Sequence, residues 1–348
     1  MKILYGIQGT GHGHISRARE LVPELNKHAE IDILISGYNY KLNLHGYNII
    51  KKRGISLEYN KNGCVSLFDT ALKIRPVRFI QDIHSVPVAS YDLVISDYEP
   101  ITAWSANSTK IKCVGLSHQA AFLSDRSPRP EKNSLFAEHI LKYFAPCTDP
   151  IGFHFRQYDT FIEPPVIRKQ VRDLNPEHQD SVVVYLPAFD HETLASVFND
   201  IREVEWHIFS PLCTKSYSKG NITVRPISNE DFLRQLESCT GIVTSAGFET
   251  SAEAMYLEKK LFIIPIQNQY EQLCNASALK RLGVSIARRW GTTIKSDLIR
   301  WIRESRIVKL EKIADTVSIT RKLLRVAGQS QFRESSTEQS SQRVKTLI

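Results

Sequence analysis

The chain has 348 residues, of which 42% are hydrophobic and 24% charged, and its formal net charge is +8. This composition is that of a globular protein long enough for two domains, and it excludes a disordered or fibrous chain as the main content. No apolar run approaches the roughly 18 residues of a membrane span, and no secretory signal is visible, so we expect a cytoplasmic protein. The 6 cysteines stand singly, which favours free thiols over disulfides or a zinc site.

Positive charge is concentrated towards the C-terminus. From Lys280 onward the chain carries 16 basic and 6 acidic residues, a balance of +10. Such a segment is typical of proteins that meet an anionic partner, although solvated helix faces and a polar tail have the same composition. We expect a peripheral contact with the inner face of an anionic membrane. No basic and aromatic module is present, so we expect no nucleic-acid partner.

Short apolar runs alternate with helical patterns along the chain, which is typical of parallel βα units. In the first half, the sequence predicts a helix near 135–144 and strands at 2–7, 31–36, 92–96 and 111–116. Two consecutive prolines in FIEPPVIRKQ then stiffen an extended segment that suits a linker. The second half predicts an amphipathic helix near 310–327 and strands at 181–187, 205–210, 221–226, 241–245 and 261–265.

These elements predict an α/β protein with two Rossmann-like parallel-sheet domains that face each other across a cleft. The expected parts are an N-terminal acceptor domain (1–163), a linker (164–171) and a C-terminal donor domain (172–328). The polar stretch 329–348 is expected to be a disordered tail.

The first motif, GTGHGHISRA at 9–18, follows the first predicted strand and opens the first helix. Gly11 and Gly13 allow backbone N–H groups to approach an anionic or oxygen-rich ligand. His12 and His14 add imidazoles suited to proton transfer near neutral pH. A nicotinamide-binding fingerprint fits poorly, because the spacing is GxGxG and the second strand ends in Ser-Gly rather than an acid.

Two further motifs lie at strand–helix junctions of the second half. In SAGFETSAEA, Gly247 permits close backbone approach and Thr250 offers a hydroxyl to a diphosphate, while Glu253 can accept two ribose hydroxyls. In IPIQNQYEQLCNA, Glu271 and Gln272 supply the carboxylate and amide groups that suit sugar hydroxyls. Each element alone could be a helix cap or a surface acid. Their order and spacing favour a nucleotide-sugar site.

Polar residues also follow two strands of the N-terminal half, Asp97 in DYEP and His118 in LSHQ. Open α/β sheets place their sites at such strand ends. An acceptor hydroxyl must lose its proton as it attacks, so His14 is a candidate base, and Asp97 can orient it or replace it. His12, His14 and His118 could in principle hold a metal, but no carboxylate spacing completes a first shell. We expect neither a metal nor a cofactor.

The segment AGFETSAEAMYLEKKLFIIPIQNQYEQLCNA resembles the nucleotide-sugar signature of GT-B glycosyltransferases. It is similar to the superfamily that comprises the lipid-II-forming N-acetylglucosaminyltransferase and the UDP-glycosyltransferases. The glycine loop of that N-acetylglucosaminyltransferase is also similar to GTGHGHI. DYEP and LSHQ resemble a group of prokaryotic glycosyltransferase-like proteins. The resemblance implies metal-independent, inverting hexosyl transfer from a nucleoside-diphosphate sugar, most often a UDP-sugar. The implied acceptor is a hydroxyl of a cell-envelope glycan or glycolipid.

The resemblance also implies the site residues. Ser245, Gly247 and Thr250 would meet the diphosphate, and His14 would act as the base or orient the acceptor. Glu249 departs from plant-type members, which carry Asn there, and brings a negative charge near phosphates unless it faces the sugar. The donor candidates are Ser245, Gly247, Phe248, Glu249, Thr250, Glu253, Glu271 and Gln272. The candidates for a phosphate or acceptor loop are Gly11, His12, Gly13 and His118.

Two alternatives stay open on the sequence alone. The same scaffold serves nucleotide-sugar epimerases and hydrolases, in which C2 chemistry or water replaces the acceptor. A non-catalytic sugar-nucleotide-binding protein would carry the same donor motifs without turnover.

Overall fold

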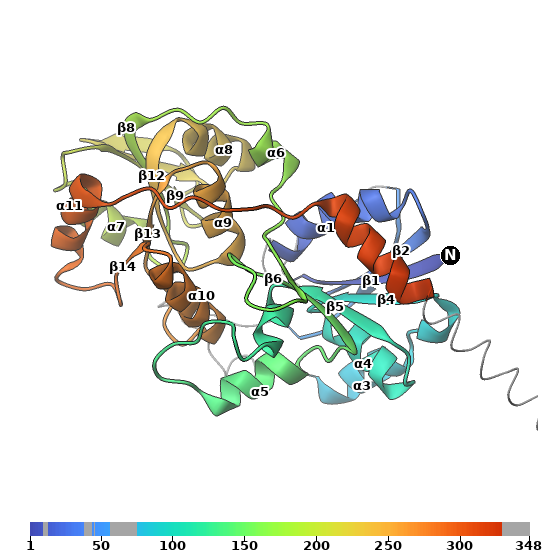
Figure 1. Cartoon of the computed structure of the whole chain (residues 1–348). Coiled ribbons are helices and arrows are strands. Elements are labelled where there is room, and N and C mark those ends of the chain that lie inside the picture. The colour runs from blue at the N-terminus through green and yellow to red at the C-terminus, as the bar shows by residue number, and fades with distance from the viewer. Residues whose placement is uncertain (10–12, 38–43, 45, 56–74, 329–348) are drawn as a thin grey trace, which may run out of the picture.

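The computed structural model describes residues 1–9, 13–37, 44, 46–55 and 75–328. These residues form two α/β domains, each built on a seven-stranded sheet (Figure 1). Gly11, His12 and the predicted tail at 329–348 lie outside the described residues.

The N-terminal sheet has the strand order β3-β2-β1-β4-β5-β6-β7, and every pair is parallel. Its central strands are buried on both faces, which explains their continuous apolar sequences. The strands are β1 (Lys2–Gln8), β2 (Glu30–Ser36), β3 (Asn48–Lys52), β4 (Leu93–Asp97), β5 (Cys113–Ser117), β6 (Asp149–Phe153) and β7 (Ile162–Glu163).

Helices connect these strands, and local chemistry fixes where they begin. α4 begins at Pro100, whose missing N–H costs nothing in a first turn. The Glu99 carboxylate caps α4 by accepting from the backbone N–H groups of Ile101 and Thr102, and the Ser36 hydroxyl also donates to it. The helices are α1 (Gly13–Leu25), α3 (Pro76–His84), α4 (Pro100–Ser108), α5 (Leu135–Tyr143) and the 3-10 turns η1 (Val88–Ser90) and η2 (Gln119–Leu123).

The C-terminal sheet has the order β10-β11-β9-β8-β12-β13-β14 and is parallel except for the β10–β11 pair. Its strands are β8 (Gln179–Tyr185), β9 (Glu205–Ser210), β10 (Tyr217–Lys219), β11 (Ile222–Pro226), β12 (Cys239–Thr244), β13 (Lys260–Ile263) and β14 (Ser285–Ile286). Its helices are α6 (Lys169–Arg172), α7 (His191–Phe198), α8 (Asn229–Ser238), α9 (Phe248–Tyr256), α10 (Tyr270–Arg281) and α11 (Ile294–Glu304).

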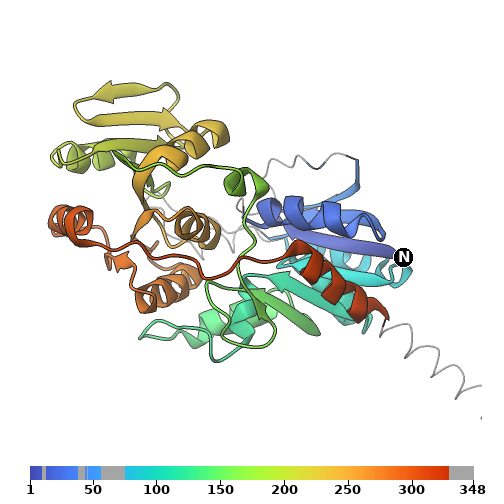
Figure 2. The ribbon, with the colours of Figure 1, turned by 45° about the horizontal axis from the view of Figure 1, so that its top comes forward.

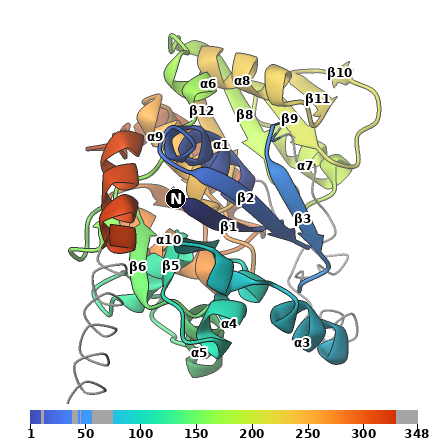
Figure 3. The ribbon, with the colours of Figure 1, turned by 90° about the vertical axis from the view of Figure 1, so that its right-hand side faces the viewer.

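The chain returns to the N-terminal domain after α11. Residues 316–328 are helical and bury Ile319, Leu323 and Ala327 along one face. Figures 1 and 3 show this red helix beside α1 and the N-terminal sheet, and Lys322 pairs with Glu163 at the end of β7. Residues 172–328 were all expected in the donor domain. Residues 316–328 pack instead on the N-terminal domain, because the apolar face of this helix must be buried and the surface of that domain covers it.

Two segments therefore cross between the domains, the linker after β7 and the chain that leads to the last helix (Figure 2). The Ala314 N–H donates to the Pro165 carbonyl over 2.8 Å, which joins these two crossings. Among the helices in the described ranges, none is both long and apolar enough to cross a bilayer.

Candidate active site

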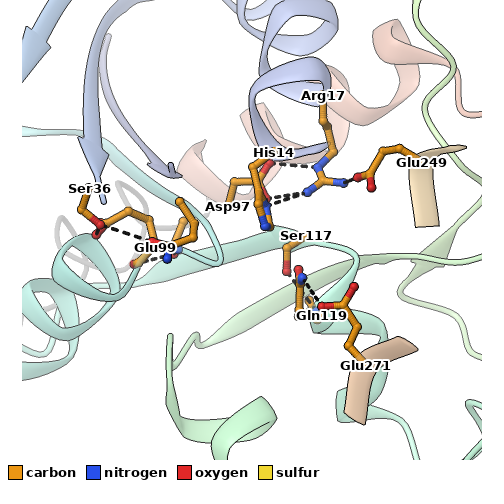
Figure 4. A network of polar contacts seen from close by, with 12 residues as sticks. His14, Arg17, Ser36, Asp97, Glu99, Ser117, Gln119, Glu249 and Glu271 are labelled. Carbon is orange, nitrogen blue, oxygen red and sulfur yellow. Dashed lines mark hydrogen bonds and ion pairs between the residues drawn. The ribbon is translucent and has the colours of Figure 1, made fainter. Parts of the chain in front are cut away.

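His14 and Asp97 meet at the C-terminal edge of the N-terminal sheet. Asp97 ends β4, where it lies in register with Ile7 of the neighbouring β1, and His14 belongs to the first turn of α1, which follows β1. Nδ1 of His14 lies 2.7 Å from Oδ1 of Asp97 (Figure 4). The βα topology thus brings together two residues that are 83 positions apart.

Arg17 holds the other side of the same carboxylate. It lies three residues after His14, on the same face of α1. Its Nε donates to Oδ2 of Asp97 over 2.9 Å, and a terminal nitrogen donates to Oδ1 over 2.6 Å. Burial alone would raise the pKa of Asp97, but the charge of Arg17 and the contacts with His14 outweigh it and lower that pKa. Asp97 is therefore ionised at neutral pH.

The ionised carboxylate fixes the tautomer of His14. A carboxylate only accepts hydrogen bonds, so the Nδ1 atom that contacts Asp97 must carry a hydrogen. The 3.1 Å approach of an Arg17 nitrogen to the same Nδ1 then joins two donors and is no hydrogen bond. A neutral His14 consequently keeps its lone pair on Nε2, which is the arrangement that a general base requires.

Glu249 reaches this pair from the C-terminal domain. A second terminal nitrogen of Arg17 donates to Oε1 of Glu249 over 3.0 Å (Figure 4). A Cβ atom on Gly13 would lie 2.4 Å from the Glu249 carboxylate, so glycine permits this close approach. The negative charge that the sequence places beside the expected phosphates therefore has a guanidinium partner.

The first turn of α9 is open. Gly247 is its N-cap residue, with φ −65° and ψ 136°, and no side chain caps the helix. A Cβ atom on Gly247 would have nothing within 4 Å, so space lies in front of the first-turn N–H groups. Such groups, together with the helix dipole, favour a bound anion. Ser245 is buried and Thr250 half-buried at this end of the helix.

His118 is occupied by the protein itself. Its Nδ1 lies 2.7 Å from the Phe153 carbonyl oxygen, and its Nε2 lies 2.7 Å from Oδ1 of Asn275 on α10. The ring stacks on Phe248 with centroids 3.9 Å apart and planes within 5°. Both nitrogens contact protein oxygen atoms, so in this arrangement His118 joins the two domains and presents neither nitrogen to a substrate.

Glu271 and Gln272, the two site candidates of the IPIQNQYEQLCNA motif, make different contacts. Glu271 faces the N-terminal domain, where Nε2 of Gln119 donates to its Oε2 over 2.9 Å (Figure 4). Gln272 turns inward, and its Oε1 accepts from the N–H groups of Ala246 at 3.1 Å and Ile266 at 3.0 Å. Gln272 therefore fixes the loops that follow β12 and β13 relative to each other.

Glu253 lies on the buried side of α9 and is paired with the linker. Nε and a terminal nitrogen of Arg168 donate to its two carboxylate oxygens over 2.6 and 2.9 Å. Burial raises the pKa of Glu253, and the Arg168 guanidinium offsets only part of this rise. Both carboxylate oxygens thus have a donor in the structure, with lone pairs left over for further hydroxyls.

Sequence reasoning missed three of these residues: Arg17, Gln119 and Arg168. Arg17 had one usable signal, its position three residues after His14 on a predicted helix. Gln119 follows His118 directly in the LSHQ motif. Arg168 lies in the linker, 85 positions from Glu253, and carries no local signal of its partner.

No group of three histidine, cysteine, aspartate or glutamate side chains comes together in the ranges that the structure describes. A cavity of about 590 Å³ lies between β14 and α11, lined by residues such as Arg289, Arg300 and Trp301. It contains none of the site residues above.

Two Rossmann-like domains that meet at a histidine–aspartate pair and an open helix N-terminus define a GT-B glycosyltransferase scaffold. The chain belongs to the family described as glycosyl transferase family 1, whose model matches residues 1–299. This confirms the resemblance drawn from the sequence. No curated protein sequence matches the chain.

Solved structures share the fold at low identity. MurG from Acinetobacter baumannii has a TM-score of 0.57 at 12% identity, covering 93% of this chain and 99% of that chain. The glycosyltransferase VinC in complex with dTDP has a TM-score of 0.55 at 13% identity, covering 94% and 100%. Arabidopsis thaliana UGT89C1 in complex with UDP has a TM-score of 0.52 at 11% identity, covering 92% and 90%. The predicted GT-B fold is confirmed.

Proposed function

We propose that the protein transfers a hexosyl group from a nucleoside-diphosphate sugar, a UDP-sugar in the first instance, to a hydroxyl acceptor with inversion at the anomeric carbon. One observation carries the proposal: the His14–Asp97 pair of one domain and the uncapped start of α9 in the other are joined through Arg17 and Glu249. A base and an anion site thus belong to one polar network, as group transfer from a diphosphate requires.

The donor is assigned to the C-terminal domain. The diphosphate would accept from the first-turn N–H groups of α9 beside Gly247, where the helix dipole stabilises the charge of the leaving group. This source of stabilisation needs no divalent cation, so we propose a metal-independent reaction. Glu253 would accept ribose hydroxyls and Glu271 would bind the transferred sugar. VinC and UGT89C1, with dTDP and UDP in their structures, support a nucleotide donor.

The proposed step is a single displacement. The acceptor hydroxyl gives its proton to Nε2 of His14 as its oxygen forms a bond to the anomeric carbon. The bond from that carbon to the diphosphate oxygen breaks, and its electron pair leaves with the nucleoside diphosphate. Asp97 holds the Nδ1 hydrogen and stabilises the imidazolium that forms. One displacement from the face opposite the leaving group inverts the configuration.

The acceptor domain is assigned to the N-terminal half, and we propose a cell-envelope glycan or glycolipid as acceptor, met at the inner membrane face. The basic C-terminal segment supports this location, since Arg288, Arg289 and Arg300 are exposed and have no ion-pair partner among the described residues. Co-sedimentation with vesicles of neutral lipid, with and without a fifth of anionic lipid, tests it. Equal recovery with both vesicles would contradict the membrane contact.

Titration calorimetry with UDP, dTDP and GDP tests the donor site. Gly247→Val puts a side chain into the open space before α9, at φ and ψ angles that valine adopts readily. Gly291→Val is the matched control, because a Cβ atom there also has nothing within 4 Å. We expect a nucleoside diphosphate to bind to the wild type and Gly291→Val, and Gly247→Val to weaken binding at least about tenfold, or about 1.4 kcal/mol. Equal affinity in all three proteins would contradict the proposed diphosphate site.

A further inference from the structure

Arg17 is a buried cation that takes no direct part in the proposed displacement. Its side chain is 3% exposed, yet it carries a full positive charge. Burying a guanidinium costs several kcal/mol unless partners compensate it, and an apolar side chain of similar size often fills such a position at lower cost. The presence of arginine here is thus not explained by packing alone.

Among the described residues, every polar contact of the Arg17 side chain is with a site residue. Two of its nitrogens bond both oxygens of Asp97, and a third bonds Glu249 (Figure 4). The face of the Phe153 ring lies 5.3 Å from its guanidinium carbon and supports the plane of the group. The guanidinium therefore cannot turn away from Asp97 without losing several contacts together.

We propose that Arg17 is a positioning residue for the His14–Asp97 pair, an inference that rests on the proposed function. Arg17 supplies the positive charge that the buried Asp97 needs, so His14 is not required as its counter-charge. Without Arg17, the imidazolium form of His14 becomes the nearest counter-charge for Asp97. A protonated His14 cannot accept the proton of an acceptor hydroxyl.

Arg17 also fixes geometry. Its fork occupies one side of the Asp97 carboxylate, which leaves Oδ1 aimed at Nδ1 of His14. Glu249 holds the remaining nitrogen from the other domain. Lysine could restore the charge, but a single ammonium group cannot reproduce a planar fork with a third bond to Glu249. Charge and geometry can therefore be separated by substitution.

The direct test is NMR of protein labelled with ¹⁵N-histidine, with the His14 signals assigned by their loss in His14→Gln. Arg17→Met is expected to raise the pH midpoint at which His14 takes up its second proton by about one unit or more, since a neighbouring positive charge is lost. Glu249→Gln removes a negative charge and is expected to leave that midpoint unchanged or lower it. Arg19→Met, an exposed arginine of the same helix, is the control and should match the wild type.

Arg17→Lys separates charge from geometry and guards against misfolding of Arg17→Met. It is expected to keep the wild-type midpoint within about 0.5 unit, because the charge remains. A folded Arg17→Met protein with the wild-type midpoint would overturn the proposal. So would an Arg17→Lys midpoint raised by a unit or more.

Turnover gives the second readout, measured as UDP release from UDP-glucose and UDP-N-acetylglucosamine. Arg17→Met is expected to lower kcat by about 10-fold to 100-fold, as is common when a group that orients a reacting side chain is removed, with the Kd for UDP changed less than about threefold. Arg17→Lys should recover part of kcat. A wild-type protein that releases no UDP from either donor would count against the proposed function. The pH midpoint of the His14 NMR signals would still test the positioning role of Arg17. An unchanged kcat in Arg17→Met would overturn the positioning role.

Discussion

Replacing Arg168 by methionine isolates the ion pair that connects the linker to the donor helix. Arg168 bonds both carboxylate oxygens of Glu253 at 2.6 and 2.9 Å, and the two side chains are 18% and 6% exposed. Methionine keeps much of the apolar stem and removes the charge. Glu253 is then a buried carboxylate without its cation.

The expected loss is about 3 kcal/mol at pH 7.5, the lower end for breaking a buried pair, because Arg168 keeps some contact with water. For a domain of this size, about 3 kcal/mol corresponds to a fall of about 6–12 °C in Tm. Exposed pairs contribute far less, about 0–1 kcal/mol. Arg303, whose side chain is 64% exposed and pairs with Glu203, is therefore a suitable control position.

The loss should depend on pH with a definite sign. The pKa of Glu253 is already raised by burial, and removal of Arg168 raises it further above the unfolded value of about 4.3. A carboxyl group with a raised folded pKa stabilises the fold most below its unfolded pKa and loses this contribution as pH rises through the folded pKa. The difference in the free energy of unfolding between wild type and Arg168→Met should therefore become smaller on acidification, by up to about 1.4 kcal/mol per pH unit.

Differential scanning fluorimetry at pH 7.5 and pH 5.5 measures this gap for wild type, Arg168→Met and Arg303→Met. Adding Glu253→Gln to Arg168→Met should recover part of the lost Tm, since the buried charge is gone. Two results would refute the reasoning: an Arg168→Met protein as stable as Arg303→Met, or a gap that is the same at both pH values.

Three further substitutions have expected outcomes. Asp97→Asn should lower kcat at least about 100-fold, because an amide lacks the negative charge that stabilises the His14 imidazolium and can turn a donor towards Nδ1, and an unchanged kcat measured by UDP release would contradict the pairing. Lys259→Met should lower stability by about 3 kcal/mol, because its buried Nζ donates to the carbonyls of Glu177, Glu237 and Cys239; urea unfolding checks this. Gly6→Ala should cost about 1–3 kcal/mol by overpacking, since a Cβ atom would lie 2.5 Å from Oγ1 of Thr102, and an unchanged Tm would show that α4 can move away.

Most of the fold could be predicted because the buried strands of a parallel sheet are continuous apolar runs. The predicted strands at 2–7 and 241–245, for example, correspond to β1 and β12. β3, β6, β7, β10 and β14 were not predicted. β6 begins with Asp-Pro and β14 has only two residues, so neither has the apolar run of a buried strand. Both are strands because a neighbouring strand pairs with them.

The meeting of His14 and Asp97 could be anticipated because both follow strands at the same sheet edge. The role of Arg17 was missed despite its spacing of three residues from His14, since an arginine in a helical pattern ordinarily lies on the solvated face. The partner of Glu253 and the surface that the last helix covers depend on contacts between distant segments. Local sequence patterns carry no information on such contacts.

A crystal structure of the protein with UDP tests the central claim most directly. We expect the diphosphate at the first-turn N–H groups of α9 beside Gly247, the ribose hydroxyls at Glu253, and Nε2 of His14 free towards the acceptor side. A UDP molecule bound elsewhere, with the start of α9 empty and Glu253 untouched, would contradict it.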